Sequence, residues 1–148
     1  MSNLNRFVEA QKEAYPVAFR EIKNGMKMSH WMWYIFPQIS GLGQSVISTY
    51  YAISDLEEAS NYLNDELLGT RLKEISSELL KLETNEPVLV FGYVDSMKLN
   101  SSMTLFDYVS DEDDNVFSRV LDKYYDGRKD DATLKIISDM RKKEIIKK

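Results

Sequence analysis

The chain has 148 residues, of which 43% are hydrophobic, and this size and composition are typical of one globular domain with its own core. Its net charge of −5 removes the main attraction for nucleic acid and anionic lipid, and the absence of cysteine excludes disulfides and thiolate chemistry. No segment approaches the ~18 consecutive apolar residues of a membrane span. We therefore expect a single cytoplasmic domain over residues 1–148 without nucleic-acid or membrane partners.

The first predicted element is a helix over residues 4–24, where apolar side chains recur at helical spacing. The members of this stripe are Val8, Tyr15, Phe19 and Ile22. Pro16 is expected to bend this helix or to begin a second one at that point. The step from Asn24 to Gly25 is a typical helix end.

The next predicted helix, at about residues 30–36, is apolar on every side and lies in the stretch MKMSHWMWYIFPQISGLG. Ser29 is a suitable N-cap, and Pro37 prevents an ordinary continuation. A helix without a polar face must be surrounded by others, so we expect it at the centre of the domain. Its start places an imidazole, an indole and a phenol on one side, since His30, Trp33 and Tyr34 have the spacing i, i+3, i+4.

The remaining elements are also predicted to be helices. Ser54 and Glu57 have capping-box spacing at the start of one helix, and Asn64 or Asp65 caps the next helix. The helix that follows Asp65 has apolar residues at Leu68, Leu72, Ile75, Leu79 and Leu82. The last two helices have apolar faces formed by Val116, Phe117, Val120, Leu121 and Tyr124 and by Leu134, Ile137 and Met140.

The run EPVLVFG is ambiguous, because its valines suit a strand whereas Pro87 suits the first turn of a short helix ended by Gly92. A lone strand has no pairing partner, so we favour the helix. The prediction is an all-α, single compact domain of about seven or eight short helices around the central apolar helix. The basic C-terminus, about residues 141–148, is expected to fray.

Five segments carry a resemblance that covers most of the chain. They are RFVEAQ, HWMWYIFPQISGLG, YLNDELLGTRL, FGYVDSMKLNSSMTLF and VLDKYYDG, in this order. From about residue 4 to 136 the chain resembles the Domain of Unknown Function 1810 family. This resemblance implies a mostly α-helical single-domain fold and no established activity. Relatives often carry a His-Pro pair where this chain has Asp65 and Glu66, so no role of that histidine carries over.

A candidate site combines the aromatic stretch with the segment DSMKLNSSMTLFDY. On a helix, Lys98, Ser101 and Ser102 share one face, which gives a cation and two hydroxyls for an anionic group. The alternative is structural: Asp95 caps the helix, the serines bond backbone carbonyls and Lys98 reaches water. Lys27, just before the apolar helix, is a second cation that is expected to converge on the same ligand.

The two functional hypotheses come from different classes. The first is a domain that binds a small anionic or nucleotide-like metabolite, with turnover left open and His30 as the candidate catalytic residue. Its ligand-binding residues are Lys27, Ser29, Trp31, Trp33, Tyr34, Gln38, Lys98, Ser101 and Ser102. The second is a protein–protein interaction module that uses the aromatic stretch without catalysis, and both monomer and homo-oligomer stay open.

No cofactor or metal site is predicted. A single histidine cannot form the multi-histidine sites that zinc prefers. The acidic run at residues 111–115 lacks the glycine and the terminal glutamate of a calcium loop, so it is expected to be a solvated helix start. The glycines of GLGQSV follow no strand and do not make a dinucleotide-binding fingerprint.

Overall fold

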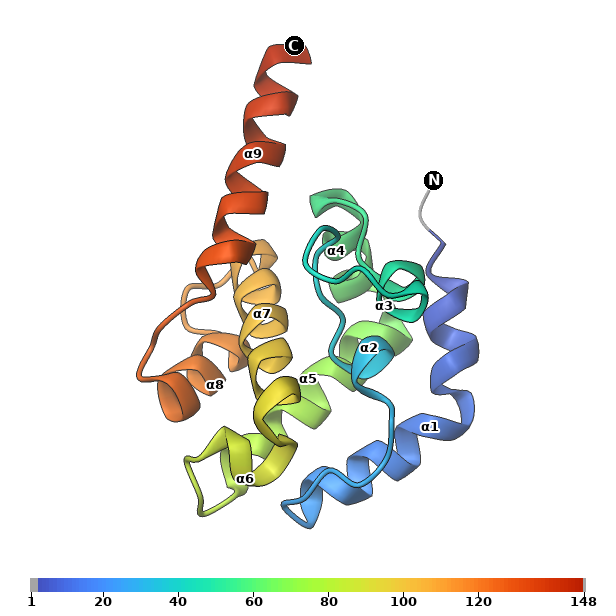
Figure 1. The fold of residues 1–148 in the computed structure, drawn as a ribbon, viewed down its shortest axis with the longest axis vertical. Coiled ribbons are helices and arrows are strands. Elements are labelled where there is room, and N and C mark those ends of the chain that lie inside the picture. The colour runs from blue at the N-terminus through green and yellow to red at the C-terminus, as the bar shows by residue number, and fades with distance from the viewer. Residues whose placement is uncertain (1–2, 148) are drawn as a thin grey trace.

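The structure is a computed structural model that describes residues 3–147. In this range the chain is α-helical without any strand, and the one β-bridge joins Ile39 to Ile53, which confirms the predicted all-α class (Figure 1). The helices are α1 (Asn5–Lys23), α2 (Met32–Ile35), α3 (Val46–Tyr51), α4 (Leu56–Asn64), α5 (Glu66–Lys81), α6 (Pro87–Phe91), α7 (Tyr93–Val109), α8 (Val116–Tyr125) and α9 (Asp131–Lys147). The sequence patterns missed α3, because none of its residues is buried and it shows no apolar stripe.

Helix α1 is a single helix that bends about halfway along its length (Figure 1). Pro16 lies inside it, and a proline removes one backbone hydrogen bond and crowds the preceding turn, so we attribute the bend to Pro16. The helix ends as predicted, with Asn24 as C-cap and Gly25 in the left-handed region at φ 80°.

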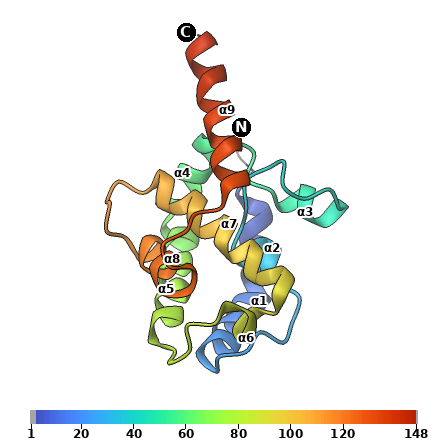
Figure 2. The same ribbon diagram turned by 60° about the vertical axis from the view of Figure 1, so that its left-hand side comes forward.

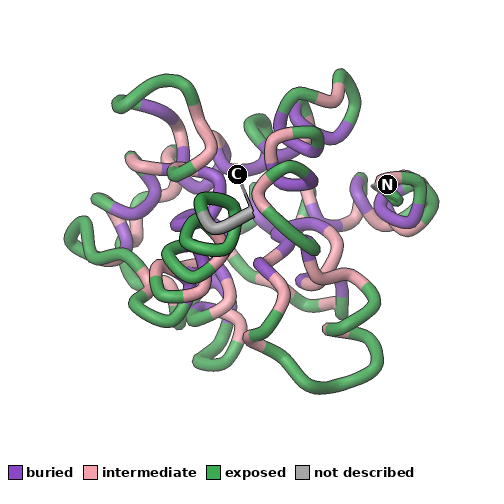
Figure 3. Tube along the Cα trace, turned by 90° about the horizontal axis from the view of Figure 1, so that it is seen from above, coloured by how far each residue is buried: buried purple, intermediate pink, exposed green. Residues whose placement is uncertain are grey.

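Helices α5 and α7 form the interior of the domain. Helix α7 contacts α4, α6, α8 and α9, and α5 contacts α1, α4 and α8. Six consecutive residues of α7, from 101 to 106, are buried, so this helix is covered on every side along that stretch. Seen from above, the peripheral loops are mostly exposed, and so is most of α9, which points towards the viewer near the centre of the view (Figure 3).

The apolar helix is shorter than the sequence predicts, since α2 covers only Met32–Ile35. Met32 and Ile35 of this helix are buried, as are the flanking Trp31 at 1% exposure and Phe36 at 0%, while Trp33 and Tyr34 are half-buried. The prediction that Ser29 caps this helix is wrong. Trp31 is the N-cap without a side-chain hydrogen bond, and both the amide and the hydroxyl of Ser29 donate to Glu21.

The other predicted helix ends are a mixture of confirmed and corrected positions. Asp65 caps α5, with its carboxylate accepting from the amides of Leu67 and Leu68. The Ser54–Glu57 capping box is wrong, because Asp55 caps α4 by accepting from the Glu58 amide at 2.8 Å. The EPVLVFG run forms the helix α6.

Helix α9 continues through the basic segment to Lys147 and extends away from the other helices (Figures 1 and 2). The fraying predicted for about residues 141–148 stays a prediction, and residue 148 lies outside the described residues. Of the helices in residues 3–147, none is long and apolar enough to cross a membrane.

Candidate functional site

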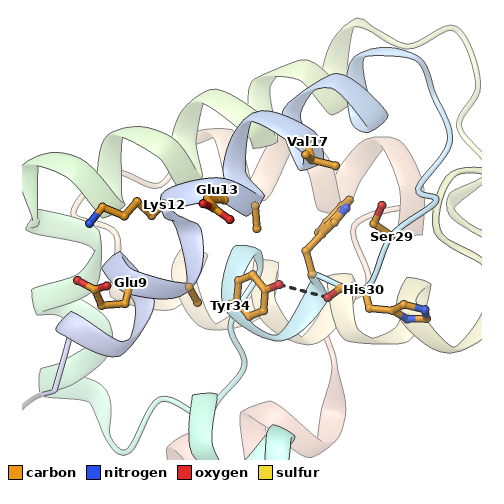
Figure 4. A pocket seen from close by; sticks show the side chains of 10 residues that line it. Glu9, Lys12, Glu13, Val17, Ser29, His30 and Tyr34 are labelled. Atoms are coloured by element: carbon orange, nitrogen blue, oxygen red, sulfur yellow. Dashed lines mark hydrogen bonds between the residues drawn. The ribbon is translucent and has the colours of Figure 1, made fainter.

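Two open grooves lie on either side of the segment that contains α2. The α1–α2 groove has a cavity of about 540 Å³ and takes Ser29, His30, Trp31 and Tyr34 from the predicted site. Its other wall is α1, which contributes Glu9, Ala10, Lys12, Glu13, Ala14 and Val17. Figure 4 shows Glu9 and Lys12 at one end of this groove and His30 at the other, with Tyr34 between them.

The α2–α7 groove has a cavity of about 480 Å³. It takes Trp33, Gln38, Lys98 and Ser101 from the predicted site. The loop before α3 and the helix α3 contribute Leu42, Gly43, Gln44, Ser45 and Ser48, while α7 contributes Val94 and Met97. Asp130, just before α9, and Ala132, in its first turn, complete the lining. The structure thus divides the predicted site between two grooves, and His30 and Lys98 line different ones.

The two predicted cations converge on one carboxylate. Lys27 Nζ lies 2.8 Å from Asp95 Oδ2, and Lys98 Nζ lies 3.3 Å from Asp95 Oδ1. Lys27 is committed to structure, because its side chain is 9% exposed and its ammonium also donates to the Ser29 carbonyl at 2.6 Å. Lys98 is 24% exposed and keeps donor capacity for a ligand. The Asp95 cap expected as the structural alternative is wrong, since Gly92 is the N-cap of α7.

Trp33 and Gln38 add polar and flat surface to the α2–α7 groove. The ammonium of Lys98 lies 4.8 Å from the centre of the Trp33 ring, a distance at which a cation is attracted to the ring face. Among residues 3–147, neither the Trp33 indole nitrogen nor the Gln38 side-chain amide has a hydrogen-bond partner. Together with Lys98, these groups offer unused hydrogen-bond donors to a ligand.

The two serines of α7 differ from each other. Ser101 lines the groove, and its hydroxyl donates to the Met97 carbonyl at 3.2 Å, as the structural alternative predicts. Ser102 is fully buried, and its Oγ has no hydrogen-bond partner in the described part of the chain. It does not line the groove cavity, so the structure gives no support to direct ligand contact by Ser102.

Glu21 fixes the position of the tryptophan-bearing segment. Its carboxylate accepts from the Met28 amide at 2.7 Å, from the Ser29 amide and hydroxyl at 2.9 and 2.6 Å, and from Trp31 Nε1 at 2.9 Å. Burial opposes its ionisation, but these hydrogen bonds outweigh burial and lower the pKa of Glu21 to about 2. Because Glu21 binds residues 28–31 in a non-helical conformation, α2 begins later than the sequence predicts.

His30 is exposed at the rim of the α1–α2 groove. Its backbone carbonyl accepts from the Tyr34 hydroxyl at 3.3 Å (Figure 4), but its imidazole has no partner within residues 3–147. Burial raises the pKa of the Tyr34 phenol above its usual value, so this hydroxyl stays protonated. A catalytic role for His30 stays a prediction. Because His30 and Trp33 line different grooves, this role does not extend to a ligand bound against Trp33.

Several residues of the α2–α7 groove and its surroundings could not be identified from the sequence. The sequence predicts Asp95, the ion-pair partner of Lys98, only as a cap, and it does not single out Val94, Met97 or Asp130. The signal for Val94 and Met97 is their i, i+3 spacing beside Lys98 on a helix whose opposite side is buried. For Asp130 no local signal exists, because it reaches the groove only through the packing of the segment before α9 against α7.

Much of the aromatic stretch is buried inside the domain, and its use as a protein-interaction surface stays a prediction. Trp31, Met32, Ile35 and Phe36 are at most 2% exposed. Several exposed apolar side chains belong instead to α6 and the first half of α7, and they are Val88, Leu89, Tyr93, Val94 and Met97. Among the described residues, no group of three or more histidine or acidic side chains is placed to hold a metal ion.

Comparisons with known proteins place this fold in a family. The family model described as "Protein of unknown function (DUF1810)" matches residues 1–137. A crystal structure of the conserved hypothetical protein Rv1873 from Mycobacterium tuberculosis is similar, with a TM-score of 0.88 and 41% sequence identity over 91% of this chain and 96% of that one. None of the curated proteins matches the chain.

Proposed function

The chain belongs to the DUF1810 family of proteins of unknown function, and from this premise we propose that it is a small-molecule-binding domain whose site is the α2–α7 groove. One observation carries the proposal. Residues from α2, from the loop before α3 and from α7 meet at a cavity of about 480 Å³, where Lys98 is held over the Trp33 ring. Ligand sites combine apolar walls with a few placed polar groups, and this groove has both.

The ligand that suits this site has a flat or apolar part and a negatively charged group. Trp33, Val94 and Met97 supply apolar contact. The ammonium of Lys98 supplies the charge, and its position is fixed in advance by Asp95 and by the Trp33 ring. Fixing the charge before binding lowers the entropy that a ligand must offset.

The function proposed for this groove is ligand binding. The α2–α7 groove contains a lysine and an aspartate but no histidine, and His30 lies in the other groove. Catalytic turnover is therefore to be tested separately, once a ligand of the groove is known.

A thermal-shift screen tests the proposal with nucleotides, nucleotide sugars and aromatic carboxylates, because a ligand that binds only the folded state raises its melting temperature. Each hit is then titrated against Lys98→Gln and Lys12→Gln. Both variants lose one lysine charge, but Lys12 lines the α1–α2 groove. We expect Lys98→Gln to weaken binding and Lys12→Gln to leave it unchanged. No hit, or equal loss in both variants, contradicts the proposal.

A second candidate function is self-association through α6 and the start of α7. It is favoured by the exposure of Leu89 at 64% and Tyr93 at 70%, since neighbouring exposed apolar side chains often mark an interface. Sedimentation velocity at rising protein concentration tests it. Association that disappears in Leu89→Ser supports it, and a monomer at all concentrations contradicts it.

A further inference from the structure

Two ionised side chains of opposite sign line the α2–α7 groove, Lys98 from α7 and Asp130 from the segment before α9. Two hydrogen bonds hold that segment along α7. Asn100 Nδ2 donates to the Arg128 carbonyl at 3.0 Å, and the Asp130 amide donates to Thr104 Oγ1 at 2.9 Å. The position of Asp130 beside the groove is thus set by the helix that carries Lys98.

The carboxylate of Asp130 is fixed in position, and in the described part of the chain only one of its two oxygens accepts hydrogen bonds. Its Oδ2 accepts from the amide of Thr133 at 2.9 Å and from the Thr133 hydroxyl at 2.6 Å, which caps α9. Its Oδ1 has no hydrogen-bond partner among residues 3–147. One oxygen therefore remains for a donor on a ligand.

The positive and negative formal charges around the α2–α7 groove favour a ligand that carries both signs of charge. Lys27, Asp95 and Lys98 form one ion-paired group with a formal charge of +1, because one carboxylate is shared by two ammonium groups. Asp130 adds a formal charge of −1 at the same cavity. A ligand that carries only negative charge is attracted by Lys98 but repelled by Asp130. A ligand that carries only positive charge is attracted by Asp130 but repelled by Lys98.

Part of the groove surface is apolar. Val94 and Met97 are 64% and 57% exposed and are accessible to a ligand. Leu42, Ala132 and the Trp33 ring line the same cavity. The groove therefore presents an ammonium, a carboxylate and an apolar surface to one ligand.

We propose that the ligand of the α2–α7 groove is a zwitterion of the α-amino-acid class with an apolar side chain, a proposal that rests on the binding function proposed above. The ligand carboxylate binds Lys98, its ammonium group donates to Asp130 Oδ1, and its side chain packs on Trp33, Val94 and Met97. Lys98 and Asp130 Oδ1 then each have a partner of opposite charge, and the apolar surface has an apolar partner.

Three probes that share a phenyl ring test this assignment by isothermal titration at pH 7. L-phenylalanine carries both charges, 3-phenylpropionate only the negative one and phenethylamine only the positive one. We expect L-phenylalanine to bind at least about fivefold more tightly than either of the other two probes. This is the increase in affinity that one additional, partly exposed ion pair provides. Alanylphenylalanine, whose charges lie further apart, distinguishes a short peptide from a free amino acid.

Matched variants assign each charge to its residue. Lys98→Gln is expected to remove the advantage of L-phenylalanine over phenethylamine, and Asp130→Asn its advantage over 3-phenylpropionate. Asparagine is itself a good N-cap, so Asp130→Asn removes the charge while α9 stays capped. Asp131→Asn is the control, because Asp131 is the next residue and does not line the cavity.

Each outcome decides between the two proposals. If 3-phenylpropionate binds as tightly as L-phenylalanine, the zwitterion is wrong and an anion site remains. If none of the three probes binds while another compound of the thermal-shift screen does, the zwitterion is wrong and the binding function stands. If neither the probes nor the screen give binding, both proposals fail.

Discussion

The α1–α2 groove and the α2–α7 groove share the tryptophan-bearing segment as a wall but differ in how their charged side chains are held. In the α1–α2 groove, Glu9, Lys12 and Glu13 have no ion-pair or hydrogen-bond partner within residues 3–147 and extend into solvent. In the α2–α7 groove, Lys98 is fixed by Asp95 and Trp33, and Asp130 by Thr133.

This difference teaches that cavity size alone does not identify a ligand site. The α1–α2 groove is the larger one, at about 540 Å³ against about 480 Å³. Its charged side chains must give up their rotamer freedom to meet a ligand, whereas those of the α2–α7 groove are already ordered. Fixed charges beside apolar walls therefore favour the smaller groove.

The largest expected effect concerns the wall that both grooves share. Glu21→Gln leaves one acceptor oxygen where four donors converge and sets an amide group against them. We expect the free energy of unfolding to fall by about 2 kcal/mol, as hydrogen bonds to a charged group contribute about 1.5–3 kcal/mol each. Urea unfolding measures it, with Glu13→Gln as an exposed control. An unchanged urea midpoint for Glu21→Gln would show that the wall does not depend on Glu21.

The same residue predicts a dependence of stability on pH. The pKa of Glu21 is lowered from 4.5 to about 2 by folding, so its contribution is present above pH 4.5 and is lost as the pH falls from 4.5 towards 2. The stability difference between the wild type and Glu21→Gln should be largest above pH 5 and shrink on acidification. A constant difference across that window would contradict the hydrogen-bond network.

A smaller effect on stability is expected at Asp95, the carboxylate that fixes Lys98 beside the α2–α7 groove. Asp95→Asn leaves Lys27 and Lys98 without their shared carboxylate, and Lys27 is nearly buried. We expect a loss of about 1–2 kcal/mol, between the values for exposed and buried pairs. Thermal and urea unfolding measure it beside Asp114→Asn, which removes an exposed pair with Arg119 and should change nothing. Equal results for the two variants would break the comparison.

Removal of the Ser102 hydroxyl is expected to stabilise the protein. The group is fully buried and has no partner in the described part of the chain, so Ser102→Ala relieves an unpaired polar atom and gains about 1 kcal/mol. Ser101→Ala, which removes a hydroxyl bonded to the Met97 carbonyl, is the control. A clear loss of stability in Ser102→Ala would mean that the hydroxyl is satisfied in solution.

The smallest effect is expected at His30. His30→Ala removes an exposed imidazole without a partner in residues 3–147, so stability should change by less than about 0.5 kcal/mol. Binding of any ligand of the α2–α7 groove should be unchanged in the same titrations. Loss of that binding would show that His30 and Lys98 act on one ligand and that the two grooves are one site.

Local patterns predicted much of the fold because their causes are local. The apolar repeats of α5 and α8, the Asp65 cap and the end of α1 at Gly25 depend on residues within a few positions of each other. The start of α2 was predicted wrongly for the opposite reason. Glu21 binds residues 28–31 from the last turns of α1, and a capping rule that considers only Ser29 does not include that carboxylate.

Helical periodicity is enough to predict one helical domain, with Trp33, Gln38, Lys98 and Ser101 among its candidate binding residues. The packing of the helices brings these four to one groove, while His30, Trp31 and Tyr34 line another. It also brought Asp95 between two lysines and Asp130 to the groove. Helical periodicity places a residue on a face of its own helix, but the partner of that face depends on how helices far apart in sequence pack.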